Sequence, residues 1–171
     1  MTVDRVRVLG IDPGSRRTGF GVLDAAGPNL TYVASGVIRT AEGDFAARLC
    51  EIFRGIQVIV AQYQPQEIAI ERVFMNRNAD SALKLGQARG AAICGTADAA
   101  ADVFEYAPRQ IKLAVVGSGS AGKAQVQLMM RSILKLGAPV AVDAADALAA
   151  AVCHALRGRA STAAARALGR V

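Results

Sequence analysis

Residues 5–39 read RVRVLGIDPGSRRTGFGVLDAAGPNLTYVASGVIR. Three apolar stretches, at 5–12, 18–23 and 30–39, are separated by a Pro-Gly pair and by Ala-Gly-Pro-Asn. Pro and Gly favour turns, whereas runs rich in Val, Ile, Leu and Phe bounded by them favour strands. Because the connections between the stretches are short, the three strands are expected to form an antiparallel meander.

The following residues predict helices and two further strands. Apolar positions recur at helical spacing over residues 44–63, and the alternating stretch 66–70 is expected to form a buried strand. A helix over 79–101 and a strand over 103–106 follow. The remaining predicted elements are a helix opened by Pro108, a Gly/Ser loop at 117–122, a helix ending near Leu136 and a last helix beginning near Asp143. This order predicts one α/β domain in which helices flank a mixed sheet.

Charge is distributed unevenly along the 171 residues, which carry a formal net charge of +6. Residues 157–171 contain arginines and no acid, so we expect a folded domain over residues 1–156 and a basic, flexible tail over 157–171. Residues 106–142 also contain basic residues and no acid, and this stretch ends at two aspartates. Such a layout is expected where polyanion binding adjoins a cation site, although a solvated surface would look the same.

Composition excludes several classes of protein. The longest stretch without a charged residue, Ala25–Ile38, contains Gly, Pro and Asn and is shorter than the roughly 20 apolar residues of a membrane span. The charged N-terminus lacks a secretory signal, so a cytoplasmic protein with no membrane partner is expected. Three scattered cysteines argue against a disulfide framework and a zinc site. Because His154 is the only histidine, chemistry should rest on carboxylates, lysines or metal ions.

Four acids stand at the ends of predicted elements. Asp12 ends the first strand, and Glu71 ends the buried fourth strand. Asp143 and Asp146 are three residues apart, so they project from one face of the last helix. Each acid also has a structural interpretation. Asp12 could form a turn and Glu71 could pair with Arg72 at the surface, while the two helical acids could be an N-cap and a first-turn acid.

Together, the four carboxylates are typical of a site for hard divalent cations. Two carboxylates about 4 Å apart repel by roughly 1 kcal/mol in water and by several times more in a cleft. Two Mg²⁺ ions would neutralise the four charges, and Mg²⁺ prefers oxygen ligands. In the two-metal scheme, one ion generates hydroxide and the other stabilises the leaving oxygen. The predicted reaction is phosphodiester hydrolysis.

A second motif favours another class of enzyme. The segment GSGSAGK at 117–123 matches the phosphate-binding loop Gly-x-x-x-x-Gly-Lys, and a strand-like stretch, 113–116, precedes it. Residues 140–143 offer a possible second magnesium motif. The match breaks at Ala124, where a Ser or Thr hydroxyl should hold Mg²⁺. A nucleotide hydrolase is therefore the less favoured interpretation.

Several segments resemble the RuvC family of bacterial Holliday junction resolvases over about residues 6–156. They are GIDPGSRRTGFGV at 10–22, IERVFMNRNADSALKLGQARG at 70–90, VVGSG at 115–119 with Lys123, and DAADAL at 143–148. The resemblance implies an RNase H-like nuclease domain over residues 1–156 and a homodimer. It also implies Mg²⁺-dependent cutting of four-way DNA junctions at two symmetric points, in DNA recombination and repair. Two Mg²⁺ ions per subunit, replaceable by Mn²⁺, and the RuvA–RuvB branch-migration complex as partner follow from the same resemblance.

The resemblance also implies roles for single residues. Those matching the family's catalytic, metal-binding carboxylates are Asp12, Glu71, Asp143 and Asp146. Lys123 and Lys112 match lysines near the scissile phosphate, so the Gly/Ser loop becomes a DNA contact and Lys123 a catalytic residue.

Three residues that follow the fourth strand are further DNA contacts on the same resemblance. Phe74 matches a residue that stacks on a base at the crossover, which is worth roughly 1–3 kcal/mol. Burial in the core would explain Phe74 equally well from sequence. Arg72 and Arg77 are also expected to bind DNA.

The helix over 79–101 resembles the family's dimer helix. Its small residues Ala82, Gly86 and Gly90 lie on one line and would allow a close approach of another backbone, either of a second subunit or of the chain's own sheet. A homodimer would present two sites with the two-fold symmetry that two matched cuts require.

A junction-binding protein without catalysis is the alternative to a nuclease.

Overall fold

A five-stranded mixed sheet in the order β3-β2-β1-β4-β5 forms the centre of the molecule. The computed structural model describes residues 5–73 and 78–167, with side chains described as far as residue 158. The strands are β1 Arg5–Asp12, β2 Arg17–Ala26, β3 Asn29–Arg39, β4 Glu67–Glu71 and β5 Asp102–Tyr106. The β1–β2 and β2–β3 pairs are antiparallel, whereas β1–β4 and β4–β5 are parallel. The predicted meander and mixed sheet are confirmed.

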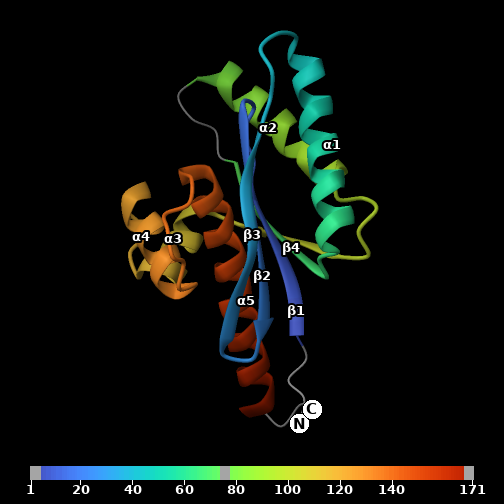
Figure 1. Cartoon of the computed structure of the whole chain (residues 1–171). Coiled ribbons are helices and arrows are strands. Elements are labelled where there is room, and N and C mark those ends of the chain that lie inside the picture. Colours follow the sequence, from blue (N-terminus) through green and yellow to red (C-terminus); the bar gives the residue numbers. More distant parts are fainter. Residues whose placement is uncertain (1–4, 74–77, 168–171) are drawn as a thin grey trace.

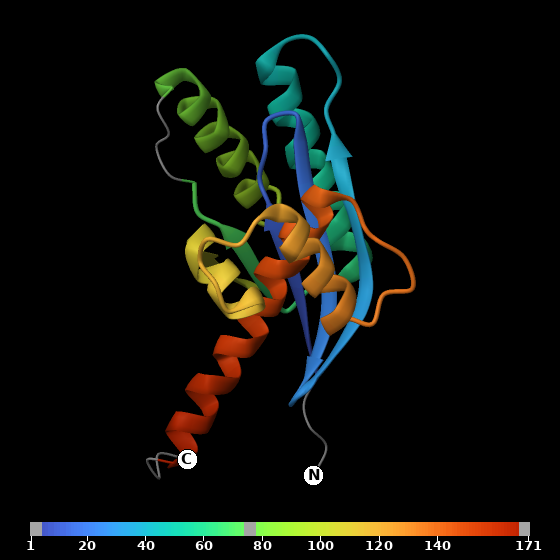
Figure 2. The same cartoon turned by 90° about the vertical axis from the view of Figure 1, so that its left-hand side faces the viewer.

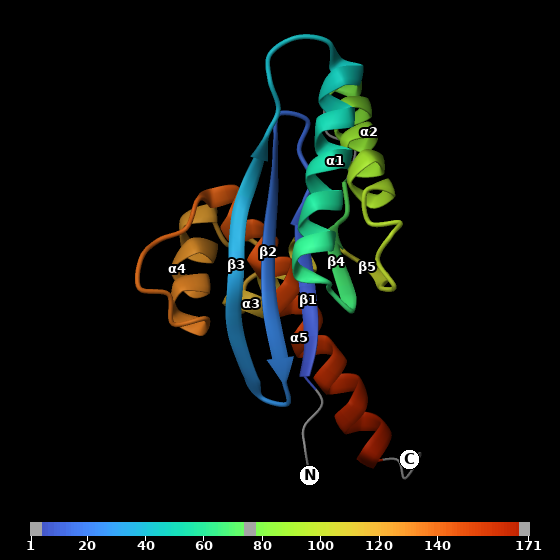
Figure 3. The same cartoon turned by 45° about the vertical axis from the view of Figure 1, so that its right-hand side comes forward.

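Helices cover both faces of the sheet, as Figures 1 and 3 show. They are α1 Phe45–Tyr63, α2 Ala79–Cys94, α3 Pro108–Val116, α4 Lys123–Ile133 and α5 Val142–Ala167. One face carries α1 and α2, and the other carries α5 with α3 and α4 packed against it. In Figure 2 the α3 and α4 helices lie in front of the first half of α5. This arrangement confirms the predicted RNase H-like layering of helices on a mixed sheet.

The alternation of side chains along the central strands divides the core into two halves. Leu9, Ile11 and Ile70 are fully buried and pack toward α1 and α2. Val8 and Ala69 are also fully buried, but they pack toward the alanine-rich α5. Because consecutive residues of a strand point to opposite faces, residues 10, 12, 69 and 71 all face α5.

The helix predicted over 79–101 is shorter than expected. The α2 helix ends at Cys94, and turns follow through residue 98. A Cβ on Gly95 would lie 2.7 Å from the carbonyl oxygen of Phe53 in α1. The glycine therefore lets the chain leave the helix close against α1, a tertiary constraint that the helical sequence pattern does not contain.

The phosphate-binding-loop interpretation of residues 117–123 is wrong. Residues 113–116, which that motif requires as a strand, belong to helix α3, and Gly117 caps its end with a φ of 81°. Residues 140 and 141 form no strand either. A loop between two helices lacks the strand–loop–helix geometry with which such loops hold nucleotide phosphates.

The helical backbone of α5 continues to Ala167, beyond the predicted domain end at residue 156. The division of the chain at that residue stays a prediction.

Among the described residues, no helix combines the length and apolar character that a membrane span requires.

The line of small residues on α2 does not pack on the chain's own sheet. A Cβ built on Gly86 or Gly90 would meet nothing within 4 Å in the described part of the chain. Leu83, on the same helix, is 68% exposed. Of the two interpretations of this line, packing on the chain's own sheet is therefore wrong.

Candidate active site

Two acids end neighbouring parallel strands. The pairing of β1 with β4 ends at Ile11 and Ile70, so the next residues, Asp12 and Glu71, lie side by side at the ends of the two strands. Both face α5, as the alternation of the strands requires. Ligand sites of open α/β sheets usually lie at the carboxyl ends of such strands.

Glycines let α5 approach these strand ends closely. A Cβ on Gly10 would lie 1.9 Å from the carbonyl oxygen of Ala147, and one on Gly19 would lie 2.0 Å from that of Asp143. No larger residue fits at either position without moving the helix. Since Asp12 pairs with Gly19 in the β1–β2 ladder, the first turn of α5 is brought directly to Asp12.

Three of the four acids line one hollow of about 150 Å³. Its walls are formed by Asp12, Glu71, Pro108, Ile111, Lys112, Lys123, Val126, Asp146 and Ala149. Lys123, the first residue of α4, holds its Nζ atom 3.0 Å from an Oδ of Asp146. The hollow thus joins the carboxylates to both lysines that sequence reasoning singled out.

The acids of the hollow strongly perturb one another. Burial raises the pKa of Asp12 to about 8, and the charges of Glu71, Asp146 and Asp143 add to the rise against the opposing effect of Lys123. Burial also raises the pKa of Glu71 to about 7, with a further contribution from Asp146. The hydrogen bond to Asp146 raises the pKa of Lys123, so its ammonium stays charged at neutral pH. The carboxylates therefore crowd together without enough positive charge to compensate them.

The donor set of the hollow fits a hard divalent cation. Its ligating atoms would all be carboxylate oxygens, which Mg²⁺ prefers, and added positive charge would offset both the burial and the repulsion that raise the two pKa values. As the side chains stand, no group of three or more His, Cys, Asp or Glu in residues 5–73 and 78–158 converges closely enough to hold a metal ion. Lys123 neutralises Asp146 in this arrangement. The fit of the hollow to a divalent cation therefore rests on its carboxylate oxygens and not on their present spacing.

The chain matches known proteins along most of its length. The family model for crossover junction endodeoxyribonuclease RuvC matches residues 8–154. The chain belongs to the RuvC family. A RuvC of Shewanella sediminis is 59% identical over 147 residues, covering 86% of this chain and 85% of the relative. A RuvC of Methylococcus capsulatus is 59% identical over 148 residues, covering 86% and 89%.

Solved structures of the RuvC family share the fold. A T. thermophilus RuvC in complex with Holliday junction substrate superposes with a TM-score of 0.83 at 33% identity, over 92% of this chain and 97% of that one. Another Thermus thermophilus RuvC structure gives a TM-score of 0.80 at 34% identity, over 91% of this chain and 97% of that one.

Asp143, the fourth acid, does not line the hollow. It is half-buried in the first turn of α5, and its charge acts on both Asp12 and Lys123. Since α5 begins at Val142, Asp143 is inside the helix, and its interpretation as an N-cap is wrong. Three of the four carboxylates that the RuvC resemblance singled out therefore line one hollow, and the charge of the fourth, Asp143, acts on Asp12 within it.

The predicted DNA-binding residues after β4 are placed differently. The Arg72 guanidinium pairs with Glu105 at 3.3 Å and not with Glu71, so the interpretation of Glu71 as a surface acid paired with Arg72 is wrong. Arg72 remains exposed and its contact with DNA stays a prediction. Phe74 and Arg77 lie outside the described residues.

Sequence reasoning missed one contact at this end of the sheet. Arg89 of α2 donates from Nε to the carbonyl oxygen of Glu71 at 3.4 Å and also pairs with Glu105. A single arginine in a helix carries no pattern that predicts a partner in a distant strand. Only the folded arrangement reveals this contact.

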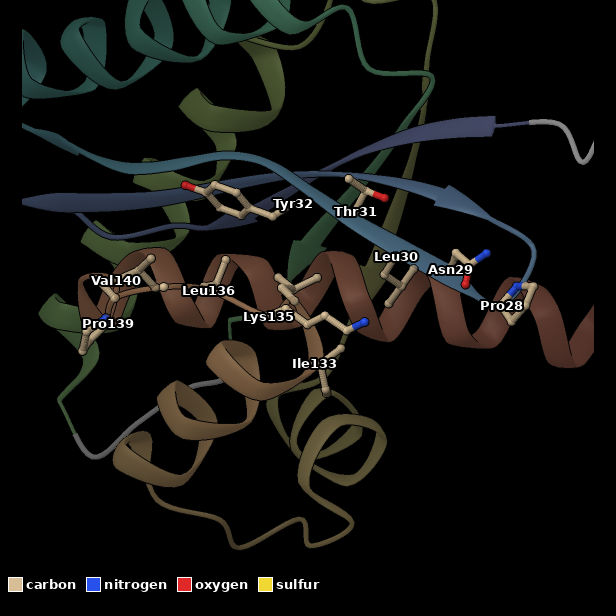
Figure 4. A pocket seen from close by; sticks show the side chains of 13 residues that line it. Pro28, Asn29, Leu30, Thr31, Tyr32, Ile133, Lys135, Leu136, Pro139 and Val140 are labelled. Carbon is tan, nitrogen blue, oxygen red and sulfur yellow. The ribbon is translucent and has the colours of Figure 1, made fainter.

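A larger hollow of about 830 Å³ lies elsewhere, between β3 and the 133–140 connection (Figure 4). Leu30 and Tyr32 form one side, and the other side includes Leu136 and Lys135. None of the acids predicted for the RuvC site lines it. The smaller hollow, where the perturbed acids meet, is therefore the better candidate for chemistry.

Proposed function

We infer that this protein is a crossover junction endodeoxyribonuclease that cuts four-way DNA junctions by phosphodiester hydrolysis, in recombination and repair. The observation that carries this function is the meeting of Asp12, Glu71 and Asp146 in one hollow of a chain that matches the RuvC family along most of its length. The RuvC relative solved with Holliday junction substrate supports four-way DNA as the substrate class.

The four carboxylates would hold the catalytic cations, which we propose to be two Mg²⁺ ions per subunit, replaceable by Mn²⁺. When bound, these ions supply Lewis acidity and charge compensation to the phosphodiester under attack. Asp12 and Glu71 would be rigidly placed ligands because they end strands of the sheet, whereas Asp143 and Asp146 would be held by α5. Four fixed carboxylates would set where the scissile phosphate can be held.

Lysines on the rim would position the DNA. Lys123 pairs with Asp146 while its side chain is 65% exposed, so its ammonium can turn from the acid to a phosphate oxygen without burial. Lys112 lines the same hollow from α3. Both lysines would act on any junction, because contacts to phosphate carry no sequence information.

The protein would act as a homodimer in which α2 forms the interface. Gly86 and Gly90 leave room for another backbone, and Leu83 offers an exposed apolar side chain beside them. Two subunits related by a two-fold axis would present two sites to the two strands that must be cut. RuvA–RuvB is the partner that we propose for the dimer on the junction.

Cleavage of a synthetic four-way junction tests the proposed function. Each of the four strands is labelled in turn, and the products are mapped in MgCl₂ and in EDTA. We expect paired cuts at symmetric positions in MgCl₂ only, and no cutting of the linear duplex of the same sequence. Absence of junction cleavage in both MgCl₂ and MnCl₂ would instead support the junction-binding protein without catalysis.

A further inference from the structure

Glu71 is the last residue of strand β4. The pairing of β4 with β1 ends one residue earlier, at Ile70. On the other side, Glu71 still pairs with Tyr106 of β5, and the next backbone N–H, that of Arg72, donates to the Tyr106 carbonyl at 2.8 Å. The peptide between Glu71 and Arg72 is thus held by β5 through its N–H.

Arg89 reaches this strand end from the opposite face of the sheet. Its Nε donates to the Glu71 carbonyl oxygen at 3.4 Å, and its NH2 pairs with Glu105. Glu105 belongs to β5 and pairs in register with Ile70. One guanidinium therefore ties the last residue of β4 to the neighbouring strand β5.

The Arg89 contacts are well fixed. Only 20% of the Arg89 side chain is exposed, and the planar guanidinium donates in fixed directions. Glu105 accepts from Arg89 with one oxygen and from Arg72 with the other. The pKa of Glu105 is lowered, chiefly by the Arg89 hydrogen bond, so the carboxylate stays charged.

The Glu71 side chain and the Arg89 contact lie on opposite sides of the same peptide. The carboxyl faces α5 and the acid hollow, whereas the carbonyl oxygen accepts from a residue of α2. Rotation of this peptide would move the Glu71 carboxyl relative to Asp12 and Asp146. A displacement of about 1 Å in a reacting group can cost on the order of a hundredfold in rate.

We propose that Arg89 is a positioning residue. It fixes the Glu71 carboxyl beside Asp12 and Asp146, and so makes the position of that carboxyl depend on helix α2. The proposal rests on the inferred nuclease function, since it concerns the same four carboxylates. The hydrogen bonds and ion pairs described for Arg89 join it to the Glu71 carbonyl and to Glu105 alone, so its effect would pass through the Glu71 peptide and Glu105.

Two substitutions at position 89 separate positioning from charge. Arg89→Gln removes the positive charge and both guanidinium contacts. Arg89→Lys retains a positive charge for Glu105 but replaces the directed Nε donor to the Glu71 carbonyl. The matched control is Lys84→Gln, which removes the exposed Lys84–Asp80 pair on the same helix.

The first measurement is Mn²⁺ binding by the DNA-free protein, followed by electron paramagnetic resonance. We expect binding weakened about three- to tenfold in Arg89→Gln and also in Arg89→Lys, with Lys84→Gln unchanged. Thermal unfolding of each variant shows whether it is folded. Wild-type Mn²⁺ affinity in a folded Arg89→Gln variant would overturn the proposal.

The second measurement separates junction binding from the cutting step. At saturating protein and MgCl₂, we expect single-turnover cutting by Arg89→Gln to fall about tenfold or more, while its Kd for the junction stays within about twofold. A variant that loses junction affinity but cuts normally once saturated would show that Arg89 supports binding or assembly instead. Wild-type protein that binds Mn²⁺ but cuts no junction would refute the nuclease function, and the Mn²⁺ result would still decide the role of Arg89.

Discussion

Replacing Asp12 by Asn should stabilise the protein while abolishing its chemistry. The pKa of Asp12 is about 8 in the folded chain, against 3.8 for the unperturbed carboxyl, because of burial and of the acids around it. Folding therefore takes up a proton at pH values between the two, and the stability of the wild type falls as the pH rises from about 4 to 8. Asn does not titrate, so this loss is absent in Asp12→Asn.

The magnitude follows from the size of the shift. One pKa unit corresponds to about 1.4 kcal/mol, so a rise from 3.8 to about 8 sets an upper limit of roughly 6 kcal/mol above pH 8. Solvent and relaxation of the neighbouring acids reduce such penalties, and we expect a gain of about 2 kcal/mol at pH 9. The gain at pH 5 should be much smaller, because Asp12 is then mostly protonated in the folded protein.

Urea unfolding in EDTA, followed by circular dichroism because the chain has no Trp, measures this difference at pH 5 and pH 9. The control is Asp98→Asn, which changes an exposed carboxyl outside the hollow. The reasoning would be refuted if Asp12→Asn changed the free energy of unfolding equally at both pH values, or lowered it at pH 9.

Three further predictions test the surroundings of the hollow. Gly19→Ala should cost about 1–3 kcal/mol of stability, because its Cβ would lie 2.0 Å from the Asp143 carbonyl oxygen, whereas Gly137→Ala meets open space and should be nearly neutral in the same urea titration. Lys112→Ala should reduce the slope of log Kd against log salt by about 1 for a four-way junction, and an unchanged slope would remove Lys112 from the phosphate contacts. Leu83→Glu should convert a dimer to a folded monomer in sedimentation equilibrium, because a charge would be buried at the α2 interface; a dimer of wild-type affinity would place the interface elsewhere.

Much of the fold could be predicted because its local and long-range preferences agree. Pro13, Gly14 and the Gly27–Pro28 pair bound strands whose apolar residues face a core on one side or both, so the meander is encoded locally. The acids at strand and helix ends could be singled out because the ends of these elements are also encoded locally. The meeting of Asp12, Glu71 and Asp146 at one hollow follows from the parallel pairing of β1 with β4 and from the close approach of α5 at Gly10.

What the sequence could not predict depends on contacts between distant elements. The early end of α2 is set by the packing of Gly95 on α1, and the Arg89–Glu105 pair joins a helix to a strand that follows it. The pairing of Lys123 with Asp146 likewise requires α4 and α5 to be in place. Helical periodicity and residue type describe each element alone and contain none of these distances.

The central claim, that the acid cluster cuts the junction, is tested most directly by Asp143→Asn. Its Kd for a synthetic four-way junction and its single-turnover cutting rate at saturating protein in MgCl₂ are measured beside those of the wild type. We predict a comparable Kd, because Asp143 donates nothing to phosphate, with cutting at least about a hundredfold slower. Undiminished nicking by Asp143→Asn would contradict the assignment of the cluster as the active site.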